Sequence, residues 1–236
     1  MLDEVVFAAG VNDSACVDEG AFNREVRLLT ETLLQCVQDD RRLVYFSSAG
    51  QVYGEHAGLR NEITPCSPTT RYGIHKLACE SLIRATDCSY LIVRLPNLVG
   101  QSKNRNQLVP QLILQAISGH ATIKVRATRD LLGVDRLKSI LLEILTTVSE
   151  RETVVLASGI SLSALEIFNE IQRILQCEAN VKLIDSGYQQ EFGTDFLRHL
   201  APINSVFEPD YPYKLLQQYV PIIASSLILR ALPSAF

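Results

Sequence analysis

The sequence lacks any block of basic residues. Its 236 residues include 22 Lys and Arg against 26 Asp and Glu, a formal net charge of −4, and the two signs are mixed along the chain. A nucleic-acid partner needs clustered cations against its phosphate backbone, so the composition argues against one. A hydrophobic content of 47% is enough for a sizeable core, in one domain or one domain plus a small lobe.

The spacings typical of metal sites are also missing. Six cysteines are scattered without a Cys-x-x-Cys pair, and the four histidines are dispersed. We therefore expect neither a metal site nor a histidine-based triad. Since no signal peptide is recognisable, we expect free thiols and a cytoplasmic location.

No apolar run is long enough to cross a membrane. The most apolar stretch, residues 220–236, is interrupted by Pro221, Arg230 and Pro233. It falls short of the roughly 20 residues that a spanning helix needs. We expect a packed tail here, with a membrane anchor as the alternative.

The most informative stretch is residues 43–76. Its first four residues, Leu43–Phe46, form an apolar run of β-forming residues, which predicts a buried strand. The run ends in Ser47 and Ser48, at the carboxyl end of the strand. In open α/β sheets that end is where ligands bind.

Tyr72 and Lys76 lie four residues apart on the helix predicted next, so they share one face. A lysine ammonium beside a phenol favours the phenolate. A tyrosine whose pKa is lowered can exchange a proton with a substrate hydroxyl or carbonyl near neutral pH. Such a pair is also common on an ordinary helix face, so the preceding strand and serines carry the functional interpretation.

Three segments, taken in order, resemble the extended short-chain dehydrogenase/reductase family of nucleotide-sugar epimerases, dehydratases and reductases. They are Phe46–Ser48, Val52–Gly54 and Tyr72–Lys76. The resemblance implies that Tyr72 is the catalytic acid/base, and that Lys76 lowers its pKa and holds the nicotinamide ribose. The family's third catalytic hydroxyl would fall on Ala49, which has none. Ser48 is the neighbouring candidate, provided that the backbone turns there, because adjacent strand residues point to opposite faces.

The resemblance also implies cofactor contacts outside the Tyr72 helix. Ala8 and Ala9 follow the first predicted strand, where small residues let the backbone approach the cofactor. Ser47 and Pro96, each at the end of a predicted strand, are the other cofactor-binding candidates. The implied cofactor is NAD or NADP.

Two further positions resemble the family's substrate-binding residues. Asn97 would contact the bound sugar nucleotide, and Arg129 would bind its diphosphate. An arginine suits that role because its planar guanidinium bonds phosphate oxygens in pairs. The alternative for Arg129 and Asp130 is a surface ion pair of little consequence.

The family's dinucleotide fingerprint is absent. No Gly-x-x-Gly-x-x-Gly occurs in the 236 residues to cradle a pyrophosphate at a helix N-terminus, and the acid for the adenine ribose is missing too. Three explanations stay open: loss of the first three strands, a separate chain that supplies them, or a natural short form. In each case we expect the strand at residues 5–7 to be covered by a partner subunit, the apolar tail or the missing segment.

We therefore predict an α/β protein with a Rossmann-like, mostly parallel sheet flanked by helices, N-terminally truncated relative to the family. The predicted core is residues 1–157, with segments of the substrate lobe inserted from about residue 98. Residues 158–236 form mainly a small C-terminal α/β substrate lobe. The resemblance also implies a homodimer through helices at residues 14–39 and 70–86.

The implied activity is that of an NAD(P)-dependent epimerase, dehydratase or reductase acting on a nucleotide-linked sugar. The alternative is a non-catalytic nucleotide-sugar-binding or assembly protein that has lost dinucleotide binding. The missing fingerprint and Ala49 favour that alternative, whereas the presence of Tyr72, Lys76, Asn97 and Arg129 argues against it. A third possibility is a cofactor-independent enzyme that uses Tyr72 as its acid/base.

Overall fold

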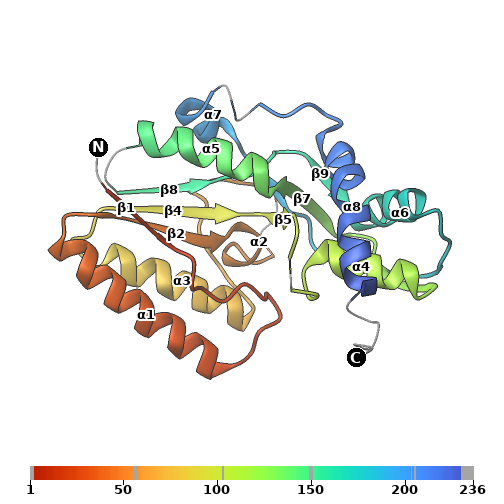
Figure 1. Cartoon of the computed structure of the whole chain (residues 1–236), viewed down its shortest axis with the longest axis horizontal. Coiled ribbons are helices and arrows are strands. Elements are labelled where there is room, and N and C mark those ends of the chain that lie inside the picture. The colour runs from red at the N-terminus through yellow and green to blue at the C-terminus, as the bar shows by residue number, and fades with distance from the viewer. Residues whose placement is uncertain are drawn as a thin grey trace.

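A parallel sheet built from the apolar runs of the sequence forms the centre of the fold. The computed structural model describes residues 3–55, 58–102, 104–148, 151–202, 204 and 206–229. The strand order is β1-β2-β4-β8, and every neighbouring pair is parallel. These strands are Glu4–Phe7, Arg42–Ser48, Tyr90–Leu95 and Arg151–Val155 (Figure 1). The predicted α/β class with a mainly parallel sheet is thereby confirmed.

Helices cover both faces of this sheet. Tyr45 on β2 packs in one apolar cluster with α1 (Glu19–Gln38) and α3 (Arg71–Arg84), whereas the adjacent Val44 packs in another with α5 (Val134–Thr147). Successive strand residues point to opposite faces, which accounts for the division. Figure 1 shows α1 and α3 on one side of the sheet and α5 on the other.

Capping residues define where the two helices near the site begin. The Asp18 side chain accepts a hydrogen bond from the Gly20 amide at 2.8 Å, at the start of α1. The Thr70 hydroxyl accepts one from the Gly73 amide at 3.0 Å, at the start of α3. Such caps satisfy amides that have no partner within the helix. Tyr72 therefore lies in the first turn of α3.

A smaller lobe lies beyond the carboxyl ends of the sheet (Figure 1). There β7 pairs in parallel with β5 and antiparallel with β9, and β6 pairs in parallel with β10. Helices α4, α6 and α8 share one buried apolar cluster with these strands. The strands are β5 (Asn97–Val99), β6 (His120–Lys124), β7 (Thr128–Gly133), β9 (Ser161–Ser163) and β10 (Asn180–Ile184), and the helices are α4 (Leu108–Ile117), α6 (Ala164–Leu175) and α8 (Tyr211–Leu229).

Short elements complete the described chain. They are α2 (Ala49–Val52), the parallel pair β3 (Leu59–Arg60) and β11 (Glu191–Phe192), and α7 (Asp195–Leu200). Of these, α2 matters most for the site, because it follows β2 without a gap and turns the chain at Ser48.

The apolar C-terminal stretch packs as a helix as far as the structure describes it. Buried residues of α8, including Leu216 and Val220, contact the cluster of α4 and α6, and Pro221 lies inside the helix rather than ending it. Among the described helices, none is long and apolar enough to cross a membrane. Residues 230–236 of the predicted tail lie outside the described residues.

The strand predicted to need a cover lies at the edge of the sheet. Within the described part of the chain, β1 pairs only with β2, and Val6 keeps 49% of its surface exposed. The helix α8 packs on the smaller lobe, so the described part of the tail does not cover β1. The rest of the tail, residues 230–236, lies outside the described residues. A partner subunit or a further segment stays a prediction.

Candidate active site

A cavity of about 570 Å³ lies at the carboxyl ends of β1, β2 and β4, between the sheet and the smaller lobe. Eight of the nine predicted site residues line it, contributed by segments far apart in the sequence. The eight are Ala8, Ser47, Ser48, Tyr72, Lys76, Pro96, Asn97 and Arg129. Ala9, the remaining candidate, is exposed and is not part of the lining.

Ser48 and Tyr72 both line the cavity. Ser48 is the last residue of β2 and the N-cap of α2, with φ −122° and ψ 105°. The chain turns immediately after it, and the Ser48 side chain lies close enough to Tyr72 to lower the pKa of the phenol, against the larger effect of burial. Ala49, where the family's hydroxyl was expected, is buried. The turn is the condition under which Ser48 was a candidate, and its catalytic role stays a prediction.

The environment of Tyr72 differs from the expected one. Its pKa is raised above the ordinary value by burial and by the negative charge of Glu25, while the Ser48 side chain acts in the opposite direction. The resemblance implied a pKa lowered by Lys76. The Lys76 ammonium lies 5.7 Å from the centre of the Tyr72 ring, but it is also bound to the Glu25 carboxylate, which offsets its charge.

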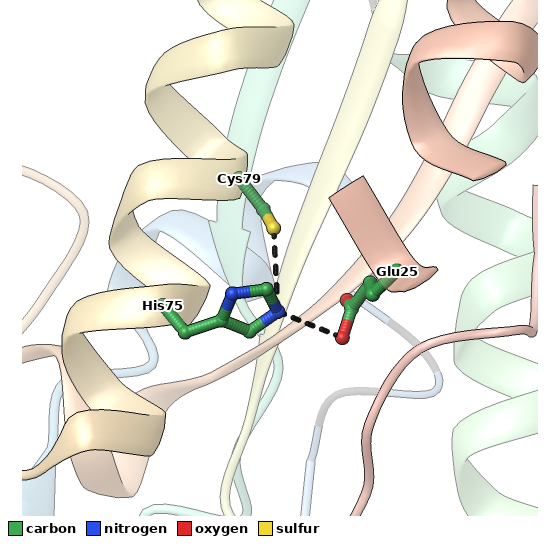
Figure 2. Close-up of side chains that lie close together, drawn as sticks. All are labelled: Glu25, His75 and Cys79. Carbon is green, nitrogen blue, oxygen red and sulfur yellow. Dashed lines mark hydrogen bonds and ion pairs between the residues drawn. The ribbon is translucent and has the colours of Figure 1, made fainter. Parts of the chain in front are cut away.

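Glu25, on α1, was missed in the sequence, and it holds Lys76. Its fully buried carboxylate accepts hydrogen bonds from Lys76 Nζ at 2.9 Å, from Tyr45 OH at 2.9 Å and from the Val11 amide at 2.7 Å. It also pairs with His75 Nε2 at 3.0 Å (Figure 2). Glu25 falls on the apolar stripe formed by Phe22, Leu29, Leu33 and Cys36. A charge within such a stripe was a sequence signal that it is buried and paired.

The same cluster contains a thiol. Cys79 Sγ lies 3.6 Å from His75 Nε2, one turn farther along α3 (Figure 2). Burial opposes charge on both Glu25 and His75, but their hydrogen bonds outweigh it, lowering the pKa of Glu25 to about 2 and raising that of His75 to about 9. Donor atoms of Glu25, His75 and Cys79 lie within 4.8 Å of one another. Because Glu25 already binds the Lys76 ammonium, the geometry favours a hydrogen-bonded ion cluster, and the absence of a metal site stays a prediction.

Ser47, also predicted at the cofactor site, has its hydroxyl engaged elsewhere. It donates to Glu80 Oε1 at 2.6 Å. Glu80 is fully buried and also accepts from Arg94 Nε at 3.0 Å and Nη2 at 2.7 Å, and from Arg84 Nη2 at 2.8 Å. Burial opposes its charge, but these bonds outweigh it and lower the pKa of Glu80. The Ser47 hydroxyl therefore supports the end of β2 from behind the cavity.

Arg129 and Asp130 do not form the surface ion pair that was the alternative interpretation. Arg129 Nη1 donates to the carbonyl oxygens of Thr128 at 2.7 Å and Tyr188 at 3.1 Å. Asp130 is fully buried and accepts from the amides of Ser158 at 3.0 Å and Gly159 at 2.7 Å. Burial raises the pKa of Asp130 to about 7, against those hydrogen bonds. The two neighbouring side chains therefore point to different environments, with Arg129 at the cavity.

Seven amide side chains line the cavity alongside apolar ones. Asn97 Nδ2 donates to the Asp130 carbonyl at 3.1 Å and to Gln190 Oε1 at 3.4 Å. Gln190 Nε2 in turn donates to the Gly50 carbonyl at 3.0 Å, joining residues 140 positions apart. No periodicity or motif marks Gln190, so sequence reasoning missed it. The other amides in the lining are Asn12, Gln51, Asn106, Gln107 and Gln111.

Comparison with known proteins places the chain in a family. The sequence model of the NAD dependent epimerase/dehydratase family matches residues 1–157, about two thirds of the 236 residues. The chain therefore belongs to the NAD-dependent epimerase/dehydratase family, as the motifs indicated. A curated relative, the GDP-6-deoxy-D-talose 4-dehydrogenase of Aggregatibacter actinomycetemcomitans, is 27% identical over 164 residues. The match covers 65% of this chain and 55% of that protein, so the chain spans about half of the relative's length.

Solved structures share the fold. The UDP-glucose 4-epimerase of Thermotoga maritima, solved with UDP-glucose, superposes with a TM-score of 0.79 at 17% identity, covering 95% of this chain and 78% of that one. The UDP-glucose 4-epimerase of Thermus thermophilus, in complex with NAD, superposes with a TM-score of 0.76 at 17% identity, covering 94% of this chain and 78% of the other. At these identities the likeness concerns the fold alone.

Proposed function

We propose that the chain acts on a nucleotide-linked sugar with the help of NAD or NADP, by epimerisation, dehydration or reduction. The observation that carries the proposal is the single cavity into which separate segments deliver a phenol, a serine hydroxyl, an ammonium and a guanidinium. Its volume of about 570 Å³ lies in the range of small-molecule sites. Family membership supports the reaction class.

In this proposal Tyr72 moves the proton. Ser48 lines the same cavity and would orient the phenol toward a reacting oxygen of the substrate. Lys76 supplies positive charge near the phenol, 5.7 Å from the ring centre, and a contact for the nicotinamide ribose. The raised pKa of Tyr72 keeps the phenol protonated at neutral pH, so its first role is to donate a proton.

Asn97 and Arg129 are proposed to hold the nucleotide sugar. Arg129 lies at the cavity with its guanidinium stacked on the Tyr188 ring at 5.1 Å and one nitrogen bound to two carbonyl oxygens. Planar guanidinium groups bond phosphate oxygens in pairs, so the diphosphate is the natural partner. The amides of the lining suit the hydroxyl groups of a sugar, because each offers both a donor and an acceptor.

The residues present fit the nicotinamide end of a dinucleotide. Ala8, Ser47 and Pro96 line the cavity that Lys76 also lines, and Ala9 follows Ala8 in the sequence. Because these side chains are short, they leave the backbone accessible to a cofactor. When bound, nicotinamide supplies hydride transfer to or from a sugar carbon. The glycine-rich turn for the pyrophosphate is not among the 236 residues. The pyrophosphate contacts are therefore what a binding experiment tests.

We also propose the domain division and dimer that the sequence suggested. Residues 1–157 would be the core, and residues 158–236 would contribute mainly to the substrate lobe. The helices of residues 14–39 and 70–86 would pair with those of a second subunit. Exposed apolar side chains on α1 and α3 support this: Val26, Leu34, Val37 and Ile74.

Calorimetric titration of the purified protein with NAD, NADH, NADP and NADPH tests the proposal. Sugar nucleotides carrying UDP, GDP and dTDP are then assayed for turnover. We expect Tyr72→Phe to lower turnover by about 10² to 10⁴-fold, because the acid/base hydroxyl is gone, and to leave sugar-nucleotide binding little changed. Tyr53→Phe is the matched control, since its buried hydroxyl bonds Arg94 and the Asn61 carbonyl instead.

The second candidate is a non-catalytic nucleotide-sugar-binding protein. The observation that favours it is the pairing of Lys76 with Glu25, which offsets the charge needed to activate Tyr72. Binding of sugar nucleotides without binding of either dinucleotide would support this candidate. Turnover that Tyr72→Phe abolishes would exclude it, and turnover without a dinucleotide would favour a cofactor-independent enzyme.

A further inference from the structure

Glu25 connects four parts of the structure through one carboxylate. It comes from α1 and contacts Lys76 and His75 on α3, Tyr45 on β2 and the backbone after β1. A fully buried carboxylate costs several kcal/mol in lost hydration unless hydrogen bonds replace the water. Here they do, so the position of Glu25 is determined by all four partners at once.

Two of these partners belong to the cavity wall. Lys76 lines the cavity and is only 3% exposed, and Val11 lines it from the segment after β1. Lys76 Nζ has two further neighbours, Tyr45 OH at 3.3 Å and the Phe46 carbonyl at 3.5 Å, but Glu25 is its one charged partner among the contacts of the described residues. The carboxylate thus restrains both a charge and a stretch of backbone that face the ligand space.

Gly10 lies directly against the ion pair. A Cβ atom at this position would come within 2.9 Å of both Glu25 Oε1 and Lys76 Nζ. Real Cβ atoms do not approach other atoms so closely, so the backbone at Gly10 packs directly against the two charged groups, with no room for a side chain. The wall formed by Gly10 and Val11 therefore depends on where Glu25 and Lys76 lie.

We propose that Glu25 is a positioning residue, whose buried carboxylate holds the Lys76 ammonium and the Gly10–Val11 wall of the cavity in the arrangement that binds the ligand. The consequence for cofactor binding rests on the proposed function. The restraint on Lys76 and on the wall does not, because it follows from the contacts alone.

His75 completes the cluster from the other side. Its ring bonds Glu25 and Cys79 and stacks on the Phe22 ring at 4.4 Å between centres. Glu25 is therefore held against α3 by two neighbouring residues, His75 and Lys76, of which only Lys76 reaches the cavity lining. The hydrogen bond from His75 restrains the Glu25 carboxylate, and the carboxylate in turn restrains the Lys76 ammonium.

The first experiment measures the chemical reactivity of Lys76, and it needs no activity. Wild type, Glu25→Gln and Glu80→Gln are treated with a lysine-acylating reagent, and each of the six lysines is followed by peptide mass spectrometry. Lys76 is only 3% exposed and its ammonium is held by Glu25, so it should react slowly in wild type. We expect at least about a tenfold faster reaction in Glu25→Gln. Glu80→Gln is the matched control, because that carboxylate is equally buried on α3 but binds arginines.

The second experiment measures ligand binding. If wild type binds NADH or NADPH, we expect Glu25→Gln to weaken the affinity by about tenfold and Glu80→Gln to leave it within about threefold, after both are shown to be folded. If wild type binds neither dinucleotide, the proposed function fails, while the reactivity of Lys76 still decides the role of Glu25. Equal reactivity of Lys76 in wild type and Glu25→Gln would overturn the proposal.

A measurement on wild type alone covers the case in which Glu25→Gln does not fold. The four histidines are titrated by NMR. Contact with Glu25 and Cys79 keeps His75 charged well above the ordinary range, with a pKa of about 9. Titration of His75 near pH 6.5 would show that the cluster is not formed and would overturn the proposal. So would stoichiometric zinc uptake that Cys79→Ser abolishes, because the carboxylate would then serve a metal instead of Lys76.

Discussion

Two fully buried carboxylates, Glu25 on α1 and Glu80 on α3, meet different partners. Glu80 binds Arg94 and Arg84, whose guanidinium groups stay charged at all relevant pH values. Glu25 binds Lys76 and His75. One of these partners, Lys76, lines the cavity.

Two equally buried carboxylates therefore have different roles, one at the end of a strand and one at the cavity wall. Around Glu80 the Ser47 hydroxyl, two arginines and Tyr53, which accepts from Arg94 at 2.9 Å, form a network behind the end of β2. That network fixes the end of β2, and its arginines keep their charge when the pH changes. The Glu25 cluster holds the Lys76 charge at the ligand space, and one of its members, His75, loses its proton in the alkaline range.

The largest effect is expected from breaking the Glu80 network. Arg94→Ala removes the main partner of a buried carboxylate and should lower the free energy of unfolding by about 3 to 5 kcal/mol. Denaturant titration measures it. The control is Arg84→Ala, whose side chain is 34% exposed and binds the same carboxylate. A loss from Arg84→Ala as large as that from Arg94→Ala would contradict the central place given to Arg94.

The second largest effect is expected in how much unfolding free energy each cluster loses as the pH rises. The folded pKa of His75, about 9, lies above its ordinary value of 6.5. Its contribution is therefore complete below pH 6.5 and lost as the pH rises through 9, at most on the order of 3 kcal/mol. The arginines of the Glu80 network lose no proton in this range. Unfolding measured from pH 6 to 10 tests this, and His75→Gln should flatten the decline.

On the acid side the two carboxylates should behave alike. The pKa of Glu25 is lowered to about 2 and that of Glu80 is also lowered. Each contribution is present above the ordinary carboxyl pKa and lost as the pH falls through the folded value. The two clusters should therefore differ only at alkaline pH. A loss of stability seen only at acid pH would contradict the contrast between them.

A smaller effect is expected on the pH dependence of turnover. Burial and then the charge of Glu25 raise the pKa of Tyr72. Glu25→Gln should therefore shift the limb that Tyr72 controls to lower pH. Glu80→Gln should leave that limb in place. The measurement is kcat/KM against pH with a sugar nucleotide, and equal shifts in the two variants would erase the distinction between the clusters.

The smallest effect is expected from Gly10→Ala. The added methyl group would crowd Glu25 Oε1 and Lys76 Nζ. Displacing them should cost about 1 kcal/mol of stability and weaken ligand binding. Calorimetric binding together with denaturant titration separates the two. An unchanged affinity would show that the wall tolerates movement and would weaken the proposed role of Glu25.

Much of the fold could be predicted from local sequence. The apolar runs that became β2 and β4 needed no tertiary information, because a strand buried on both faces consists of consecutive apolar residues. The capping box of Ser163 and Glu166 likewise marked the start of α6. These signals lie within a few residues, and so does the spacing of Tyr72 and Lys76.

The partners of the site residues could not be predicted in this way. Gln190 reaches Gly50 across 140 positions, and Glu25 meets Lys76 across 51. A Glu on the apolar stripe of α1 signalled that it would be paired, but not with which residue. Likewise, Ser48 and Tyr72, 24 positions apart, line one cavity, with α2 turning the chain directly after β2.

By itself the sequence determined the α/β class, the family and the residues that could carry chemistry, because each is written in short-range patterns. Only the tertiary structure decided that Lys76 is bound to Glu25, that Ser47 supports Glu80 and that the pKa of Tyr72 is raised. The physical reason is that charge and hydrogen-bond energies depend on distance and burial. Those are set when helices and strands far apart in the chain pack together.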